Sequence, residues 1–148
     1  MLDKNFEAIV GSLFAIIPLL KRDLIRPEMD NVEYNLSPSH FHLLFMLDDL
    51  GVQSMSEIGR HMQINKSNLT PLVQRLIDNQ LVERIYDEKD RRYIRIGLTA
   101  IGKKLLEVHK GMMSERLMKK LRVLSPEELQ RLADSLTDVK ELMLKLYD

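Results

Sequence analysis

The sequence predicts a mainly α-helical protein with a small β-hairpin: a winged helix-turn-helix lobe with a long helix at each end. Two alternating runs, Val82–Tyr86 and Tyr93–Leu98, flank a polar segment, which is the pattern of a hairpin. Shorter helical patterns precede the hairpin, and apolar-striped patterns lie near both chain ends. We therefore expect a single domain over residues 1–148, with the lobe at 37–103 and the flanking helices at 1–36 and 104–148.

Composition is that of a folded protein with one domain. The chain has 148 residues, of which 45% are hydrophobic and 30% are charged. It has no cysteine, which excludes disulfides, thiolate metal ligands and thiol redox switches. No apolar run approaches the roughly 18 residues of a membrane span. No signal peptide is recognisable either, so we expect a cytoplasmic protein without membrane association.

The charges are unevenly distributed although the net charge is zero. Residues 54–104 hold ten Lys and Arg against six Asp and Glu, so the two flanks together are acidic. A basic middle between acidic ends is typical of a protein that binds DNA through one region and assembles through another.

The N-terminal segment has the pattern of an amphipathic helix. Its apolar residues recur at helical spacing: Phe6, Ile9, Val10, Leu13, Ile16, Ile17, Leu20 and Leu24. Pro18 lacks the amide hydrogen that would bond to the carbonyl of Phe14, which predicts a bend there. Pro27 is expected to end this helix, and residues 28–36 are expected to form a linker.

Capping residues predict the first two helices of the lobe. Ser37 followed by Pro38 predicts a helix that runs to Gly51. Ser54 and Glu57 fit a capping box, which predicts a short second helix.

The third helix of the lobe is predicted to follow a turn at residues 64–66. Pro71 lies inside it, and a missing amide hydrogen is tolerable only near a helix start. We therefore expect the helix to start nearer Ser67 than Asn65. It is expected to end at Asn79, a residue type that adopts the left-handed conformation more readily than most.

Two further helices are predicted after the hairpin. Thr99 is expected to cap the first, with four apolar residues facing inward: Ile101, Leu105, Val108 and Met112. Ser125, Pro126 and Glu128 predict the start of the second, because they supply a cap, a proline at the first position and an acid at the third.

The last helix has the spacing of a heptad seam. Its apolar residues alternate three and four apart: Leu129, Leu132, Leu136, Val139, Met143 and Leu146. Two long striped helices at the chain ends favour a symmetric homodimer over packing within one monomer, since twofold dimers are the commonest oligomers.

The third helix of the lobe and the hairpin loop carry side chains suited to DNA. The exposed helix face offers residues that would reach a major groove: Lys66, Ser67, Asn68, Thr70, Gln74 and Arg75. Asn and Gln pair with adenine, Arg with guanine, and Lys and Ser with phosphates. The loop adds cations suited to the negative potential of a minor groove: Lys89, Arg91 and Arg92. Acids pointing outward would repel phosphates, so we expect Asp87 and Asp90 to shape the turn through backbone hydrogen bonds or to pair with an arginine.

These motifs together resemble the MarR family of transcriptional regulators. The resemblance is carried by Ser56-Glu57-Ile58-Gly59, Lys66–Leu76, Leu81-Val82-Glu83-Arg84, Asp87–Arg92 and Leu98-Thr99-Ala100-Ile101-Gly102. It implies a winged-helix homodimer that binds pseudo-palindromic double-stranded DNA, usually as a repressor. It also implies release of the DNA on binding a small, often phenolic, effector. By the same resemblance, five residues would face the major groove: Ser67, Asn68, Thr70, Gln74 and Arg75. Three residues of the hairpin loop, called the wing in this family, would contact DNA there: Lys89, Arg91 and Arg92.

Two positions depart from the family pattern. The usual glycine before the Leu-Val-Glu-Arg run is Gln80 here, so the helix exit must rely on Asn79 or on a strained Gln80. With Leu69-Thr70-Pro71, the chain resembles a subset of the family that has Leu-Thr-Pro at this point. That subset includes peroxide sensors that use a reactive cysteine. The chain has no cysteine, so thiol sensing is excluded.

No pattern points to catalysis, a metal or a cofactor. His40 and His42 lie about 200° apart around a helix axis and cannot share one ion. The sequence contains neither a nucleophile–base–acid set nor a phosphate-cradling glycine loop, so we expect no enzyme activity. No residue stands out as an effector contact. The alternative to a DNA-binding regulator is a winged-helix module for protein–protein interaction without specific DNA binding.

Overall fold

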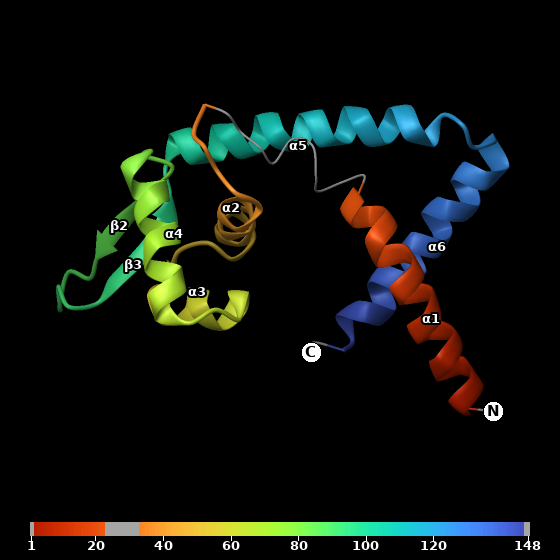
Figure 1. The fold of residues 1–148 in the computed structure, drawn as a ribbon, viewed down its shortest axis with the longest axis horizontal. Coiled ribbons are helices and arrows are strands. Elements are labelled where there is room, and N and C mark those ends of the chain that lie inside the picture. Colours follow the sequence, from red (N-terminus) through yellow and green to blue (C-terminus); the bar gives the residue numbers. More distant parts are fainter. Residues whose placement is uncertain (1, 23–32, 147–148) are drawn as a thin grey trace. The chain divides into compact units, whose positions relative to one another are not determined.

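The computed structural model describes residues 2–22 and 33–146 and confirms a mainly α-helical fold with a small hairpin. The elements, in chain order, are α1 (Leu2–Leu20), α2 (Pro38–Leu50), β1 (Gln53–Ser54), α3 (Met55–Met62), α4 (Lys66–Asp78), β2 (Val82–Tyr86), β3 (Ile94–Leu98), α5 (Ala100–Leu121) and α6 (Pro126–Leu144), and Figure 1 labels all of them except β1. The chain forms two compact units, residues 1–113 and 114–148. None of the described helices combines the length and the apolar character that a bilayer span requires.

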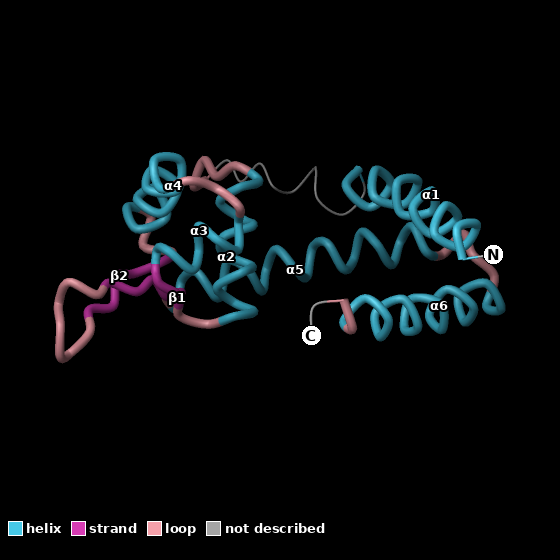
Figure 2. Tube along the Cα trace, turned by 90° about the horizontal axis from the view of Figure 1, so that it is seen from below, coloured by secondary structure: helices cyan, strands magenta, loops and turns pink. Residues whose placement is uncertain are grey.

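A winged-helix lobe occupies residues 36–106. Its core consists of buried apolar side chains from the helices and the sheet: Leu36, Phe41, Leu43, Leu44, Leu47, Ile58, Leu69, Val73, Leu76, Leu81, Val82, Ile96 and Leu106. Figure 2 shows the hairpin of β2 and β3 projecting away from the cluster of α2, α3 and α4. Because Leu69, Val73 and Leu76 turn one face of α4 into this core, the opposite face of α4 is left on the surface.

The sheet has three antiparallel strands in the order β1–β3–β2. Val82 pairs with Leu98 and Tyr86 with Ile94, so the predicted hairpin forms almost residue for residue. Strand β1 was not predicted, because it has two residues and cannot display an alternating pattern.

The predicted caps of α2 and α3 are present. Ser54 accepts a hydrogen bond from the Glu57 amide at 3.2 Å, and Glu57 accepts one from the Ser54 amide at 2.9 Å. At the start of α2, His40 plays the part of the acid, since its Nδ1 atom accepts a hydrogen bond from the Ser37 amide at 2.9 Å. Two effects lower the pKa of His40: its burial, which is the larger effect, and the positive charge of Arg75. The lowered pKa favours the neutral ring, whose Nδ1 atom can accept this hydrogen bond. His42 is exposed and is not part of this cap, so the two histidines have different surroundings.

The expected start of α4 near Ser67 is wrong. The helix begins at Lys66, and Asn65 is its cap, with its Oδ1 atom accepting a hydrogen bond from the Asn68 amide at 3.0 Å. The cap governs the start because it satisfies an amide that would otherwise lack a partner. Pro71 therefore lies in the second turn, deeper inside the helix than expected.

Gln80, and not Asn79, adopts the left-handed conformation where α4 ends. Its φ angle is 59°, whereas that of Asn79 is −86°. The amide of Leu81 donates to the Leu76 carbonyl and the amide of Gln80 to the Ile77 carbonyl, both at 2.9 Å. This is the Schellman arrangement, in which buried Leu81 and Leu76 provide the apolar contact.

The predicted cap of α5 is confirmed, but the predicted inward face is wrong. Thr99 Oγ1 accepts a hydrogen bond from the Gly102 amide at 3.0 Å. The buried residues are Gly102, Leu106 and His109, and the His109 ring stacks on that of Phe41 with 4.4 Å between centroids. Three of the four residues expected inside are about half exposed, at 47% for Ile101, 55% for Val108 and 50% for Met112. The lobe packs against the stripe of α5 that contains Gly102, because a glycine lets the α5 backbone approach closely. A different stripe of α5 has the more apolar side chains.

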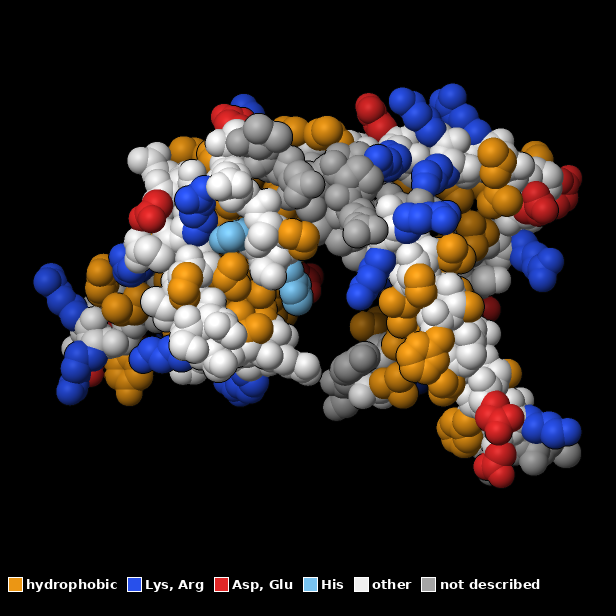
Figure 3. All heavy atoms as spheres, viewed as in Figure 1, with side chains coloured by type: hydrophobic (Ala, Val, Ile, Leu, Met, Phe, Trp, Pro, Cys, Tyr) orange, Lys and Arg blue, Asp and Glu red, His pale blue; other side chains and the backbone are white. Residues whose placement is uncertain are grey.

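Helix α1 exposes its apolar side chains along its described length, as Figure 3 shows. Phe6 is 62% exposed and Phe14 is 74% exposed. Pro18 lies inside the helix. The predicted end at Pro27 and most of the predicted linker lie outside the described residues.

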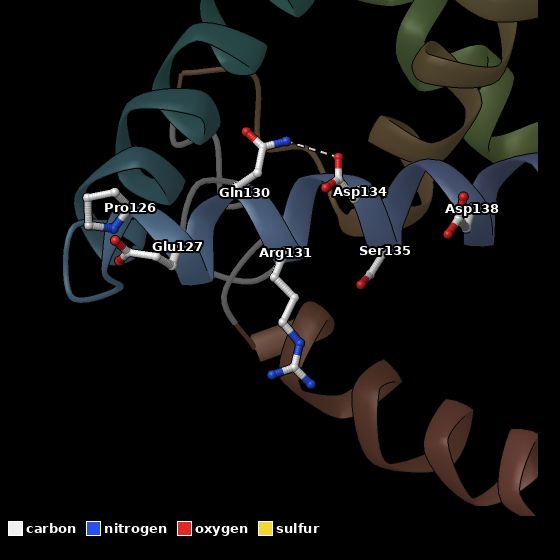
Figure 4. Close-up of a pocket in the computed structure, with 7 residues that line it drawn as sticks. All are labelled: Pro126, Glu127, Gln130, Arg131, Asp134, Ser135 and Asp138. Carbon is white, nitrogen blue, oxygen red and sulfur yellow. Dashed lines mark hydrogen bonds between the residues drawn. The ribbon is translucent and has the colours of Figure 1, made fainter.

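Helix α6 begins as predicted. Ser125 accepts a hydrogen bond from the Glu128 amide at 3.2 Å, and Pro126 is the first helical residue. No residue of α6 is buried within the chain, and Leu136 and Leu142 of its apolar side are 57% and 62% exposed. Figure 4 shows the side chains that line a hollow along this helix: Pro126, Glu127, Gln130, Arg131, Asp134, Ser135 and Asp138. Every lining residue is exposed and belongs to one helix, so the hollow is helix surface and not a binding cavity.

Candidate nucleic-acid interface

None of the six candidate residues of α4 belongs to the buried core of the lobe. Five of them are exposed: Lys66, Ser67, Asn68, Thr70 and Arg75. Gln74 is half-buried, beside Val73, which belongs to the core. These side chains thus lie along the accessible part of a helix whose buried side is anchored in the core.

Local hydrogen bonds sort these six side chains into two groups. Ser67 Oγ donates to Asn65 Oδ1 at 2.7 Å, and Thr70 Oγ1 donates to the Lys66 carbonyl at 2.8 Å, so both hydroxyl protons are used within the helix. The side chains of Lys66, Asn68 and Arg75 make no hydrogen bond to any other described residue. These three have their full donor capacity available for a ligand.

Gln74 connects α4 to the wing, which is the hairpin of β2 and β3 with the loop at residues 87–93. Its Oε1 atom accepts a hydrogen bond from Arg84 Nη2 at 2.7 Å, and its Nε2 atom donates one to Asp78 Oδ1 at 2.8 Å. Arg84 lies on β2, ten residues further along the chain. Sequence reasoning placed Arg84 in a family motif but missed this contact, because no local signal links a strand residue to a helix residue.

The acidic residues of the wing loop shape the turn, as expected. Asp87 Oδ1 accepts a hydrogen bond from the Lys89 amide at 2.8 Å. Asp90 Oδ1 accepts from the Arg92 amide at 3.0 Å, and the Asp90 carboxylate also binds the Arg92 guanidinium through two hydrogen bonds of 3.0 Å. The hydrogen bond from Arg92 lowers the pKa of Asp90, so this carboxylate is charged at neutral pH.

The three wing cations therefore differ in what they can offer. The Arg92 side chain is 90% exposed, but its charge is matched by Asp90. Lys89 and Arg91 are exposed, and neither side chain bonds to another described residue. Figure 3 shows Lys and Arg side chains gathered at the end of the lobe where the wing projects.

A hollow beside the start of α4 adds a cation that sequence reasoning missed. It is lined by residues of α3, the turn and α4: Met55, Ser56, Gly59, Arg60, Ile64, Lys66 and Leu69. Arg60 and Lys66 place two positive charges around it, and both side chains are exposed. Arg60 directly follows the Ser56-Glu57-Ile58-Gly59 motif and lies four residues after Ser56. Helical spacing therefore indicates that Arg60 and Ser56 share one face of α3, which is the signal that could have identified Arg60.

Thr99 links the start of α5 to the segment between α4 and β2 through two hydrogen bonds. Thr99 Oγ1 donates to the Gln80 carbonyl at 2.5 Å, while the Thr99 amide donates to the Leu81 carbonyl at 3.1 Å. The exit of α4, the start of β2 and the start of α5 are therefore tied at one point.

Comparisons with known proteins agree with this arrangement. The family model described as "MarR family" matches residues 36–94. The chain is 27% identical over 111 residues to the HTH-type transcriptional regulator YpoP of Bacillus subtilis, which covers 74% of this chain and 79% of YpoP. It is 32% identical over 108 residues to the HTH-type transcriptional regulator YfiV of the same species, which covers 72% of this chain and 66% of YfiV. The structure of RV1404 from Mycobacterium tuberculosis shares the fold, with a TM-score of 0.80 and 20% identity over 93% of this chain and 92% of that one.

Proposed function

Since the chain belongs to the MarR family of transcriptional regulators, we propose that two copies of it bind one pseudo-palindromic DNA operator and repress the adjoining gene. Members of this family are DNA-binding regulators and not enzymes. The observation that carries the proposal is the surface shared by α4 and the wing, where exposed polar and cationic side chains flank a rigid core. A regulator that binds operator DNA works in the cytoplasm, and we propose that location for this protein.

In this proposal α4 enters the major groove. Asn68 and Arg75 read base edges, because amide and guanidinium groups pair bidentately with adenine and guanine. Lys66 contacts a phosphate that borders the groove, and Gln74 contacts a further base. Ser67 and Thr70 would donate to neighbouring phosphates by giving up their hydrogen bonds to Asn65 and to the Lys66 carbonyl. The wing enters the neighbouring minor groove with its cations: Lys89, Arg91 and Arg92.

The homodimer is supported by the apolar sides of α1 and α6. Each helix leaves large apolar side chains on the surface of a single chain, for example Phe14 on α1 and Leu136 on α6. Exposed apolar rows of this length mark protein–protein interfaces. We assign residues 1–36 and 104–148 to dimerisation and residues 37–103 to DNA binding. Two α4 helices would then lie about 34–36 Å apart, one turn of DNA.

A small-molecule effector would release the DNA by changing the spacing of the two α4 helices. A hollow between α2 and α5 supports this part of the proposal, since aromatic, apolar and charged groups line it: His42, Phe45, Met46, Asp48, Asp49, Leu50 and Lys110. Lys110 lies 2.6 Å from Asp48 and 5.7 Å from the centre of the Phe45 ring. An anionic compound seated there would compete with Asp48 for the Lys110 charge.

Salt dependence of DNA binding tests the central claim. The probe is a pool of duplexes with a randomised centre, from which the wild-type protein selects its preferred sequences. Affinity for the selected duplexes should fall steeply between roughly 50 and 200 mM salt, because bound phosphates release counterions. Lys89→Ala and Arg91→Ala should weaken binding to every duplex, whereas Asn68→Ala should broaden the selected sequences.

The result that contradicts the proposal is a wild-type protein that retains no duplex at low ionic strength. A weak response to salt, together with binding to a protein partner, would favour a protein-interaction module instead. Dimerisation is tested by sedimentation of Leu136→Lys, which should be monomeric, against Glu141→Lys, which changes charge elsewhere on α6 and should remain dimeric.

A further inference from the structure

The side chain of Gln74 is held between two opposite charges. Arg84 donates to its oxygen at 2.7 Å from β2, and Asp78 accepts from its nitrogen at 2.8 Å, one turn further along α4. The elements that carry these groups are anchored in the core, since Val73 and Leu76 bury the inner face of α4 and Val82 is 2% exposed at the start of β2. We refer to these three residues as the Arg84–Gln74–Asp78 chain.

The two charges allow only one orientation of the Gln74 amide. A guanidinium has only donors and an ionised carboxylate has only acceptors. Turning the amide by 180° would face its NH2 group with Arg84 and its carbonyl with Asp78, so both hydrogen bonds would become repulsive contacts. A solvated glutamine has no such restriction and presents its donor and acceptor in either order.

The bound amide still has capacity for a base. The oxygen of Gln74 has a second lone pair and its nitrogen has a second hydrogen. Adenine in the major groove requires one donor to its N7 atom and one acceptor for its N6 amino group. An amide fixed in one orientation meets that requirement for adenine on one strand, and it fails when the pair is reversed.

We propose that Arg84 and Asp78 are specificity-determining residues that act through Gln74, by fixing which edge of the amide faces the DNA. This inference rests on the proposed function, because it assigns a role within the same DNA-binding surface. Arg84 is a positioning residue in this arrangement: its effect on binding passes through Gln74, and it neutralises no phosphate itself.

Selection from the randomised duplex pool tests the proposal with four variants. Gln74→Leu, which removes the amide and leaves an apolar side chain one atom shorter, should lose the base preference at one position of each half-site. Arg84→Ala should lose the preference at that same position, and the double variant should lose nothing more. Arg84→Lys should restore part of the preference, because its ammonium can still donate to Gln74. The matched control is Arg95→Ala, which removes an exposed arginine from the neighbouring strand β3 and should leave all preferences intact.

Two quantities separate this role from simpler ones. Discrimination between A·T and T·A at the affected position should fall by roughly 5- to 150-fold, the scale of one bidentate contact to a base. The slope of log affinity against log salt should not change in Arg84→Ala, whereas loss of a direct phosphate contact would reduce it by about 0.9. Thermal unfolding of each variant shows whether the lobe remains folded.

Three results would overturn the inference. Arg84→Ala could leave the preference at the Gln74 position intact. It could weaken all duplexes equally with a reduced salt slope, which would identify a phosphate contact. Gln74→Leu could change no position at all. Failure of the proposed function is a separate result, since the wild-type protein itself would then select no sequence.

Discussion

Gly102 of α5 lies directly against the backbone carbonyl of Leu81, so closely that a methyl group at position 102 would overlap the carbonyl oxygen. That carbonyl also accepts a hydrogen bond from the Thr99 amide, which fixes it in place. The start of α5 and the exit of α4 can therefore approach only because residue 102 has no side chain. The contact accounts for the glycine in the Leu-Thr-Ala-Ile-Gly motif in steric terms.

Substitution of this glycine should destabilise the lobe. Gly102→Ala should lower the free energy of unfolding by about 1–3 kcal/mol, because the neighbour that must move is backbone and not a flexible side chain. Urea unfolding followed by circular dichroism measures the change. Gly111→Ala is the matched control in the same helix, since no atom lies within 4 Å of an added methyl group. It should stabilise the protein by up to about 1 kcal/mol, and equal effects of the two substitutions would refute the steric argument.

Gln80 stores backbone strain that glycine would relieve. A left-handed residue with a side chain costs about 1–2 kcal/mol, and glycine adds about 0.4–1 kcal/mol of unfolded-state entropy. Gln80→Gly should therefore raise the free energy of unfolding by up to about 1 kcal/mol, and Gln80→Val should lower it, since β-branched residues avoid this region. The urea midpoint measures both changes. A midpoint for Gln80→Gly at or below that of the wild-type protein would show that position 80 is not strained.

Features that depend on neighbours in the sequence were predictable. The capping box of Ser54 and Glu57 and the paired strands of the hairpin are encoded within a few residues, so pattern and spacing were sufficient. The turn-forming roles of Asp87 and Asp90 follow for the same reason.

Features that depend on tertiary packing were not predictable. The inward face of α5 is decided by the close approach of Gly102 to Leu81, whereas a hydropathy pattern favours the more apolar stripe. The left-handed residue at the end of α4 follows from where the helix stops, and that point is set by packing of Leu76 and Leu81. In the candidate DNA-binding surface, residue types and positions were accessible, but the partner of Gln74 was not, because it belongs to a different element.

Protonation of His40 should weaken the start of α2. Burial and the Arg75 charge lower the pKa of His40 in the folded state, so the unfolded chain binds this proton more readily. The contribution to stability is complete above the unfolded pKa of about 6.5, and it is lost as the pH falls through the lowered folded pKa. The free energy of unfolding should therefore decrease on acidification from neutral pH.

The variant His40→Gln isolates this contribution. Glutamine at the third helical position can accept the Ser37 amide hydrogen bond, but it does not titrate. Urea unfolding at several pH values should show a smaller loss of stability on acidification than in the wild-type protein. His42→Gln, which alters an exposed histidine on the same helix, should keep the wild-type pH dependence. Parallel pH profiles for the wild-type protein and His40→Gln would rule out the role of His40.

The ion pair between Asp90 and Arg92 should limit how strongly the wing binds DNA. Arg92 offers its charge to a phosphate only by giving up a bidentate contact with Asp90. Asp90→Asn keeps an oxygen that accepts from the Arg92 amide and removes the competing charge. Affinity for the selected duplexes should rise by roughly two- to fivefold, the scale of an exposed ion pair.

The salt dependence identifies the source of that increase. If Arg92 engages a phosphate once it is released, the slope of log affinity against log salt should become steeper by up to about 0.9. Asp87→Asn is the matched control, because Asp87 bonds to backbone amides and to no arginine side chain in the described part of the chain. Asp87→Asn also removes one negative charge, but its slope of log affinity against log salt should equal that of the wild-type protein. An Asp90→Asn protein that binds no more tightly than the wild type, with its thermal unfolding unaltered, would show that the pair does not hold Arg92 back.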